Sequence, residues 1–207
     1  MLDADVSRKA GWTLVDLAAA CLSGGARVLQ VRAKAASSGW LLDIATAICD
    51  VAHRAGAIVI INDRADIARL SGADGVHVGQ DDLDPRAARV LVGESAIVGV
   101  STHTPEQMAA ALTAPISYMA CGPVFQTGTK DTGYESGGLD LVRRAASVAP
   151  ASILPVVAIG GITLETAPAV LEAGAASVAV ISDLWTTGDP EARVRQYVQR
   201  LSRGDKV

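Results

Sequence analysis

Two short acidic segments in this chain directly follow apolar runs, and together they could hold a metal ion. The segments are Asn62-Asp63 and Gln80-Asp81-Asp82. Carboxylates from the ends of neighbouring strands can share one hard cation, and Mg²⁺ binds one or two carboxylates together with phosphate oxygens and water. The alternative is that these acids cap the following helices, or that Asp63 pairs with Arg64.

An amide and two cations converge at the end of another apolar run. In the segment Gln30-Val31-Arg32-Ala33-Lys34, strand alternation places Gln30, Arg32 and Lys34 on one side. Arginine contacts phosphate oxygens through two N–H groups and lysine acts as a point charge, so the pair suits a pyrophosphate. A solvated strand end is an equally weighted alternative for this motif alone. Beside the two acidic segments, the cations favour a site for metal and pyrophosphate.

A long loop from Gly122 to about Gly138 carries a second set of polar groups. Its segment Thr127-Gly128-Thr129-Lys130 places two hydroxyls around a glycine and then a lysine, an arrangement that can surround a phosphate with donors. Loops of this length in compact domains are usually functional. The alternative is a connecting segment with incidental polarity.

Gly160-Gly161 and Ile181-Ser182 follow the last two apolar runs. Parallel barrels bind phosphate at these positions through backbone amides and helix N-termini. Glycines allow the backbone to approach the anion closely. A glycine pair alone is weak evidence, but its place near the last strands favours a phosphate site.

Three further residues could do chemistry, but the sequence favours structural roles for them. His77 lies inside an apolar run, where packing or flanking a substrate is expected rather than acting as a base. His103 lies in a turn at a helix entry, and Cys121 has no evident activating partner.

Seven apolar runs, each ending in polar residues, must position these groups. Such runs alternating with helix-length segments are typical of parallel strands buried on both faces, which places all seven polar ends on one face of one sheet. The runs are Arg27–Val31, Ala57–Ile61, Gly75–Val78, Ala96–Val100, Ile116–Ala120, Leu154–Ile159 and Ser177–Ile181. Helices are predicted over 12–23, 38–54, 64–71, 84–92, 105–113, 138–149, 164–173 and 189–202, with Thr163 as the cap before the seventh.

The pattern predicts a (β/α)8 barrel in a single domain spanning residues 1–207, in which the first strand is truncated or missing. Eight helices but only seven clear strands are present, because only Met1-Leu2-Asp3 precedes the first predicted helix. A missing strand would leave two unpaired sheet edges. We therefore expect that the native chain has residues upstream of Met1.

Composition narrows the class of protein without indicating a reaction. Half of the residues are hydrophobic and 3% are aromatic, so the core must be aliphatic. The net charge of −4 and the absence of a Lys/Arg run argue against nucleic-acid binding. Three cysteines without metal-like spacing favour a reduced, cytoplasmic protein. No window reaches the ~18 apolar residues of a membrane span. The oligomeric state stays open, with a homo-oligomer among the options.

The chain resembles the thiamine-phosphate synthase family from about Gln30 to Ser182. Six ordered blocks carry the resemblance, which makes it far more specific than a lone glycine motif. The blocks are Gln30-x-Arg32-x-Lys34, Ile61–Arg64, Gly72–Gln80 with Asp82, Gly99–His103, Gly122–Phe125 with Thr127-x-Thr129-Lys130, and Val157–Ile162.

The resemblance implies a role for each matching residue. A hydroxymethylpyrimidine pyrophosphate would be bound by Gln30, Val31, Arg32, Ala33, Lys34, Asn62, Ser101 and Lys130. A thiazole phosphate would be bound by Thr127, Gly128, Thr129, Gly161, Ile181 and Ser182. Mg²⁺ would be held by Asp63 and Asp82. The catalytic set would be Arg32, Lys34, Ser101 and Lys130.

The resemblance implies a transferase of thiamine biosynthesis. It would join 4-amino-2-methyl-5-hydroxymethylpyrimidine pyrophosphate to 4-methyl-5-(2-phosphoethyl)thiazole, carboxylated or not, and release pyrophosphate in a dissociative, Mg²⁺-assisted substitution. Two alternatives are a thiazole tautomerase-like relative and a non-catalytic phosphate-binding barrel. Neither needs both the pyrophosphate clamp and the metal site, so the full charge set argues against them.

Overall fold

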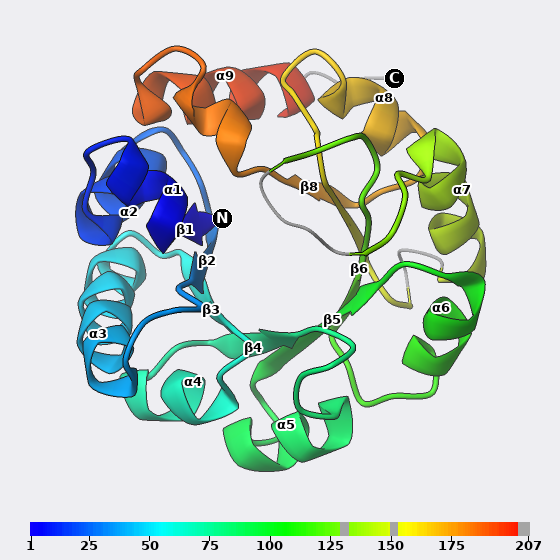
Figure 1. The fold of residues 1–207 in the computed structure, drawn as a ribbon, viewed down its shortest axis with the longest axis horizontal. Coiled ribbons are helices and arrows are strands. Elements are labelled where there is room, and N and C mark those ends of the chain that lie inside the picture. The colour runs from blue at the N-terminus through cyan, green and yellow to red at the C-terminus, as the bar shows by residue number, and fades with distance from the viewer. Residues whose placement is uncertain (129–132, 150–152, 203–207) are drawn as a thin grey trace.

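Eight parallel strands curl into a barrel in which the strand order follows the sequence (Figure 1). The computed structural model describes residues 1–128, 133–149 and 153–202. The strands are β1 (Leu2–Asp3), β2 (Val28–Arg32), β3 (Ile58–Asn62), β4 (Gly75–Val78), β5 (Ile97–Thr102), β6 (Tyr118–Cys121), β7 (Val156–Ile159) and β8 (Ser177–Ala179). The α/β barrel predicted from the sequence is confirmed.

Helices form an outer ring around the strands (Figure 1). They are α1 (Ala4–Lys9), α2 (Leu14–Ser23), α3 (Ser38–Arg54), α4 (Ala65–Ser71), α5 (Pro85–Val92), α6 (Pro105–Ala111), α7 (Gly138–Val148), α8 (Ala167–Glu172), α9 (Pro190–Leu201) and the 3₁₀ helix η1 (Ser182–Trp185). None of the helices in the described ranges is long and apolar enough to cross a membrane. Aliphatic side chains fill the layer between strands and helices, as the low aromatic content predicted.

Side-chain caps fix where several helices begin. Thr13, Ser37 and Asp189 each accept a hydrogen bond from the backbone N–H three residues later. Gly72 ends α4 in the left-handed conformation, with φ of 73°, which a residue without a Cβ adopts at little cost. These local signals set the lengths of the connections and so bring the carboxyl ends of all strands to one rim.

The first strand is present but only two residues long. It pairs in parallel with β2, Leu2 opposite Val31 and Asp3 opposite Arg32. The sequence did not predict α1, which follows at once because Asp3 caps it by accepting hydrogen bonds from the Asp5 and Val6 backbones.

A seam lies between β8 and β1, where the described residues form no ladder. The amino group of Met1 donates to the Val180 carbonyl at 2.9 Å and so links the chain across this seam. Beside it, Val28 at the start of β2 is 60% exposed although it belongs to a barrel strand. The barrel is therefore closed less completely here than between its other neighbouring strands.

Two predicted elements end or begin elsewhere for identifiable reasons. The helix expected over 164–173 begins only at Ala167, because residues 164–166 form a turn before it. Within this turn the Thr163 hydroxyl accepts from the Thr166 N–H at 3.4 Å, and the Thr163 N–H donates to Thr166 Oγ1 at 3.0 Å. The last strand ends at Ala179 rather than Ile181, because the chain turns into η1.

Candidate active site

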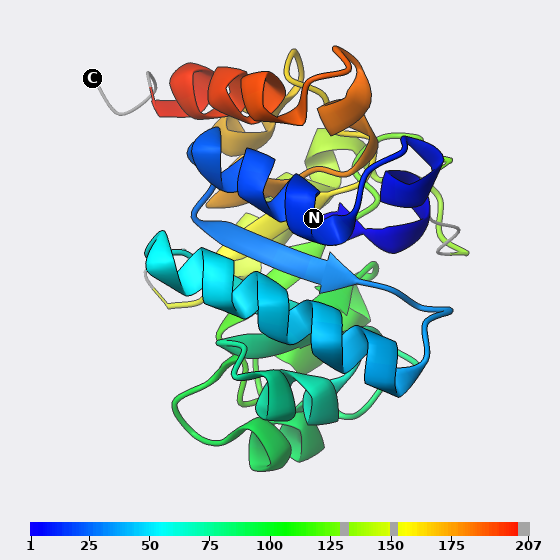
Figure 2. The same cartoon turned by 90° about the vertical axis from the view of Figure 1, so that its left-hand side faces the viewer.

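The carboxyl ends of the strands meet at one rim, where a cavity of about 860 Å³ extends into the barrel. Figure 2 shows β2 pointing toward this rim, while the C-terminus lies at the other end of the molecule. The predicted site residues that line the cavity are Gln30, Arg32, Asn62, Asp63, Ser101, Thr127, Gly161, Ile181 and Ser182. Residues from most of the chain's length therefore face one space.

Arg32, at the end of β2, is paired with Asp3 at the end of β1. Its Nη1 donates to Asp3 Oδ2 at 2.5 Å, and the two side chains are 14% and 3% exposed. Because Asp3 also caps α1, the carboxylate is fixed at this place and in turn fixes the guanidinium. Limited exposure reduces the screening of this ion pair by water.

Asp63 lies between a lysine and a second carboxylate. Lys34 Nζ is 3.0 Å from Asp63 Oδ2. Burial, and next the hydrogen bond with Asp82, raise the pKa of the Asp63 carboxyl, while Lys34 opposes that shift. Asp82 is held at the same rim because its Oδ2 accepts from the Gly79 backbone at 2.9 Å.

The backbone of Asp63 is left-handed, with φ of 65°. It is the only residue other than glycine in the described ranges with a positive φ. Aspartate tolerates this conformation better than most residues, but it still costs about 1 kcal/mol or more. The Asp63 N–H donates to the His77 carbonyl at 2.7 Å, which stabilises the turn at the end of β3. Such strain is typical of functional sites.

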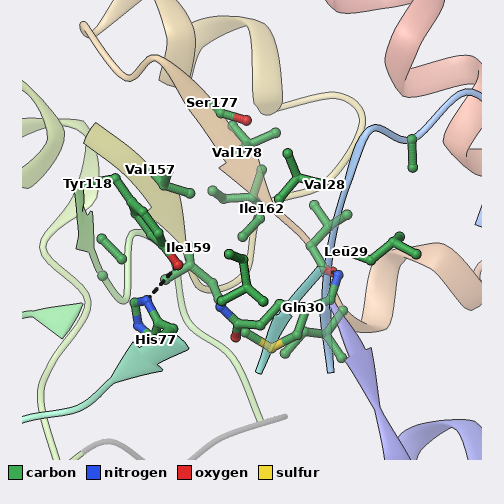
Figure 3. A pocket seen from close by; sticks show the side chains of 18 of the residues that line it. Val28, Leu29, Gln30, His77, Tyr118, Val157, Ile159, Ile162, Ser177 and Val178 are labelled. Carbon is green, nitrogen blue, oxygen red and sulfur yellow. Dashed lines mark hydrogen bonds between the residues drawn. The ribbon is translucent and has the colours of Figure 1, made fainter. Parts of the chain in front are cut away.

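A buried hydrogen-bonded chain lies deeper in the cavity. His77 Nδ1 is 2.8 Å from the Tyr118 hydroxyl, as Figure 3 shows, and His77 Nε2 is 2.8 Å from Ser101 Oγ. Burial raises the pKa of the Tyr118 phenol, and a hydrogen bond with the Gln30 side chain offsets part of that shift. The Gln30 Oε1 atom is buried and has no hydrogen-bond partner among the described residues.

The opposite side of the rim is built from closely packed backbone. A side chain at Gly161 would meet the Gln126 carbonyl oxygen at 2.5 Å, and its φ is 63°. The Phe125 N–H donates to the Gly160 carbonyl at 2.9 Å, so the loop after β6 is fastened to the loop after β7. Half-buried Ile181 and exposed Ser182 follow β8, and Ser182 begins η1. Only glycine allows these two loops to approach so closely.

The remaining predicted site residues are placed differently. Val31 is fully buried in the core between strands and helices, so any contact with a substrate would involve its backbone. Ala33 is half-buried, and Lys34 and Gly128 are exposed. Thr129 and Lys130 lie outside the described residues. His103 has the structural contacts expected of it, because its Nδ1 is 2.5 Å from the Gly122 carbonyl oxygen and its ring stacks on Tyr134.

Sequence reasoning missed two members of the site. Asp3 pairs with Arg32, but it lies in the segment that seemed too short to form a strand. Tyr118 is the first residue of its strand, whereas the polar residues that the sequence pattern indicated follow the last residue of each strand. The register of β5 and β6, which places Tyr118 opposite Gly99, was not readable from the sequence.

The paired carboxylates fit a magnesium site that is completed by a substrate. Asp63 and Asp82 are close enough for one to raise the pKa of the other, and bringing two carboxylates together is favourable when a cation lies between them. The described residues contain no group of three or more metal-binding side chains. Two carboxylates are nevertheless enough for Mg²⁺, which takes its other oxygens from phosphates and water.

Fold and rim together define an α/β-barrel protein with opposed polar groups around a deep cavity. The family model described as thiamine monophosphate synthase matches residues 4–184. The chain belongs to this family. Its activity is that of a thiamine-phosphate synthase, which is a transferase.

Individual relatives agree with the family match. A thiamine-phosphate synthase from Koribacter versatilis is 43% identical, over 91% of this chain and 87% of the relative. A thiamine-phosphate synthase from Mycobacterium tuberculosis is 40% identical, over 96% of this chain and 92% of the relative. The structure of thiamine phosphate pyrophosphorylase from Pyrococcus furiosus superposes with a TM-score of 0.82 at 28% identity, covering 91% of this chain and 89% of that one.

Proposed function

We propose that the cavity joins the pyrimidine pyrophosphate to the thiazole phosphate, carboxylated or not, and releases pyrophosphate, together with CO2 where the thiazole is carboxylated, to give thiamine monophosphate. One observation carries this proposal. A charged side, with Arg32 and Asp63, faces a glycine-rich side, with Gly161 and Ser182, across a single cavity. Such an arrangement suits two phosphorylated substrates whose reactive ends meet between them.

In the reaction that we propose, the bond between the pyrimidine methylene carbon and the pyrophosphate oxygen breaks, and both electrons leave with pyrophosphate. The thiazole nitrogen then forms the new bond to this carbon with its lone pair. With the non-carboxylated thiazole no proton transfer is required, so the contribution of the protein is positional and electrostatic. The carboxylated thiazole would also lose CO2, and a proton from water would take the electron pair left on the ring carbon. Arg32, held by Asp3 through Nη1, would use its other N–H groups on oxygens of the leaving group. Lys34 would exchange Asp63 for those oxygens, with Lys130 as a third cation.

Asp63 and Asp82 would hold Mg²⁺, which supplies charge neutralisation for the leaving pyrophosphate. Lys34 would then be released from Asp63 toward the phosphate oxygens, and Asn62 lies on the same strand end. The left-handed turn at Asp63 directs this carboxylate beside Asp82 before any ligand binds, so little reorganisation is needed.

The buried chain below the rim would receive the pyrimidine ring. Because Gln30 Oε1 has no partner among the described residues, the Gln30 amide nitrogen is the atom placed to donate to Tyr118. Oε1 is then available to accept from the amino group of an aminopyrimidine, and satisfying it recovers about 1–3 kcal/mol of desolvation cost. Ser101 Oγ, which is hydrogen-bonded to His77, would contact the same pyrimidine ring.

The glycine-rich side would bind the thiazole phosphate through Thr127, Gly128, Thr129, Gly161, Ile181 and Ser182. Anchoring this phosphate fixes where the thiazole nitrogen meets the methylene carbon, which converts an encounter into an oriented reaction. We place the reaction in the cytoplasm, because three free cysteines suit a reducing compartment.

The test is pyrophosphate release from the two substrates with Mg²⁺. We expect Asp63→Ala and Lys130→Ala to lower kcat about 10²–10³-fold, the scale of a lost oxyanion contact. The exposed residues Asp43 and Lys9 provide matched controls, and Asp43→Ala and Lys9→Ala should leave the rate unchanged. Near-normal rates in either test variant would refute the site. Failure of the unmodified protein to release pyrophosphate would favour a tautomerase-like relative or a non-catalytic barrel.

A further inference from the structure

A buried ion pair joins η1, which follows β8, to the last helix. Arg193 on α9 donates from Nε to Asp183 Oδ2 at 2.9 Å and from Nη2 to Asp183 Oδ1 at 3.0 Å. Tyr197, one turn further along α9, donates its hydroxyl to Asp183 Oδ2 at 2.5 Å. All three residues are at most 7% exposed.

This network lies directly behind the glycine-rich side of the rim. Asp183 follows Ser182 in the chain and belongs to η1, the first turn after β8. Arg193 Nη2 is also 3.7 Å from Glu165, which lies in the loop that begins at Gly160-Gly161. Glu165 is 71% exposed, so this second contact is weak, but it places the same guanidinium against both loops.

The chemistry of the network favours a role in geometry over one in stability alone. A buried ion pair often stabilises a fold no better than apolar residues of the same volume, because removing two charges from water is costly. A bidentate arginine–carboxylate contact instead fixes the angle between the two groups. Apolar packing of η1 on α9 would hold the turn without fixing the direction of its backbone amides.

We propose that Arg193 is a positioning residue, which through Asp183 holds Ile181 and Ser182 in the arrangement that binds the phosphate of the second substrate. This inference rests on the proposed function of the same rim. A binding site that is correctly arranged only part of the time has an apparent affinity reduced by that fraction. Loosening the network should therefore weaken the binding of the thiazole phosphate but not that of the pyrimidine pyrophosphate, because the pyrimidine side of the cavity is built from other strands.

The experiment compares Arg193→Lys and Tyr197→Phe with the unmodified protein in steady-state kinetics on both substrates. Arg193→Lys keeps the charge but loses the bidentate contact, and we expect KM for the thiazole phosphate to rise about tenfold. Tyr197→Phe removes one hydrogen bond and should give a smaller rise. KM for the pyrimidine pyrophosphate should change less than about twofold in both variants. Calorimetric titration with the thiazole phosphate alone should show the same loss of affinity.

Arg89 offers a matched control at the opposite end of the barrel. Its guanidinium donates to the carbonyls of Gly93 and Glu94 at 3.1 Å and to that of Pro115 at 3.3 Å, and so joins two connecting loops away from the rim. Arg89→Lys should lower the melting temperature to a similar extent as Arg193→Lys and leave both KM values unchanged.

The outcomes separate the inference from the function on which it rests. The positioning role would be overturned if folded Arg193→Lys kept its affinity for the thiazole phosphate, or if KM rose equally for both substrates. Either result would leave the proposed function intact. If Arg193→Lys does not fold, unchanged affinity in Tyr197→Phe overturns the positioning role in the same way. An unmodified protein that does not bind the thiazole phosphate would overturn both.

Discussion

Gly99 shows how a single inner residue determines the shape of the cavity. It lies opposite Tyr118 in the register of β5 and β6, and a Cβ at this position would be 2.1 Å from Cζ of the Tyr118 ring. We predict that Gly99→Ala displaces the ring, breaks its contact with His77 and lowers kcat/KM for the pyrimidine substrate. The overpacking should also cost about 1–3 kcal/mol of stability, measured by denaturant unfolding.

Gly39 provides the control for that substitution. It lies in α3, and a Cβ there would meet nothing within 4 Å. Gly39→Ala should be neutral or stabilise the protein by about 0.5–1 kcal/mol, because alanine loses less entropy in a helix. Equal effects of Gly99→Ala and Gly39→Ala on kcat/KM would show that the position of the Tyr118 ring does not depend on the absence of a Cβ at Gly99.

The proximity of Asp63 and Asp82 predicts a pH dependence of metal binding. Because the folded pKa of Asp63 is raised from 3.8, apo-protein stability should fall as pH rises from about this unfolded value through the folded one. Mg²⁺ needs the ionised carboxylate, so the increase in melting temperature on adding Mg²⁺ should grow over the same range. Asp82→Asn removes one cause of the raised pKa of Asp63. In this variant the Mg²⁺-induced increase in melting temperature should therefore begin at lower pH, although the metal binds more weakly. No movement would contradict the coupling of the two acids.

At the scale of elements, the seam beside β8 predicts uneven opening of the barrel. β8 has a ladder with β7, whereas no ladder joins it to β1 in the described residues; β4 has ladders on both edges. We predict that amides of Ser177–Ala179 exchange with solvent about tenfold or more faster than those of Gly75–Val78, a difference of about 1.4 kcal/mol. Native-state hydrogen exchange read by mass spectrometry tests this. Equal protection would mean that the seam is closed as firmly as a ladder.

The elements also show what could be read from the sequence. Alternation of Gln30, Arg32 and Lys34 and the polar ends of strands were sufficient to predict a common rim, because parallel strands end on one face. Asp3 was not predicted as part of the site, because a two-residue strand has no periodicity and is recognised only by its partner β2. The contact of Arg193 with Asp183 likewise depends on how α9 lies against η1, which local patterns do not encode.

At the scale of the whole molecule, the three cysteines report on global unfolding. Cys21, Cys49 and Cys121 are free and buried. Burial raises the pKa of Cys49 to about 11 and that of Cys121 to about 12, and it raises the pKa of Cys21 as well. Since the thiolate is the reactive form, a folded protein at pH 8 should contain almost none of it.

We therefore predict that a chromogenic disulfide reagent at pH 8 labels these thiols only at the rate at which the barrel opens, and labels all three at once in denaturant. Val90 is 82% exposed on α5, so Val90→Cys supplies a thiol that should react immediately in the folded protein. The same pKa shifts set an alkaline limit on stability. Between the unfolded value of 9.0 and the folded value of about 11 for Cys49, only the unfolded chain loses its proton, so stability falls as pH rises. Rapid labelling of the unmodified protein without denaturant would mean that the strand–helix layer opens locally, and then the thiols would not report on the barrel as a unit.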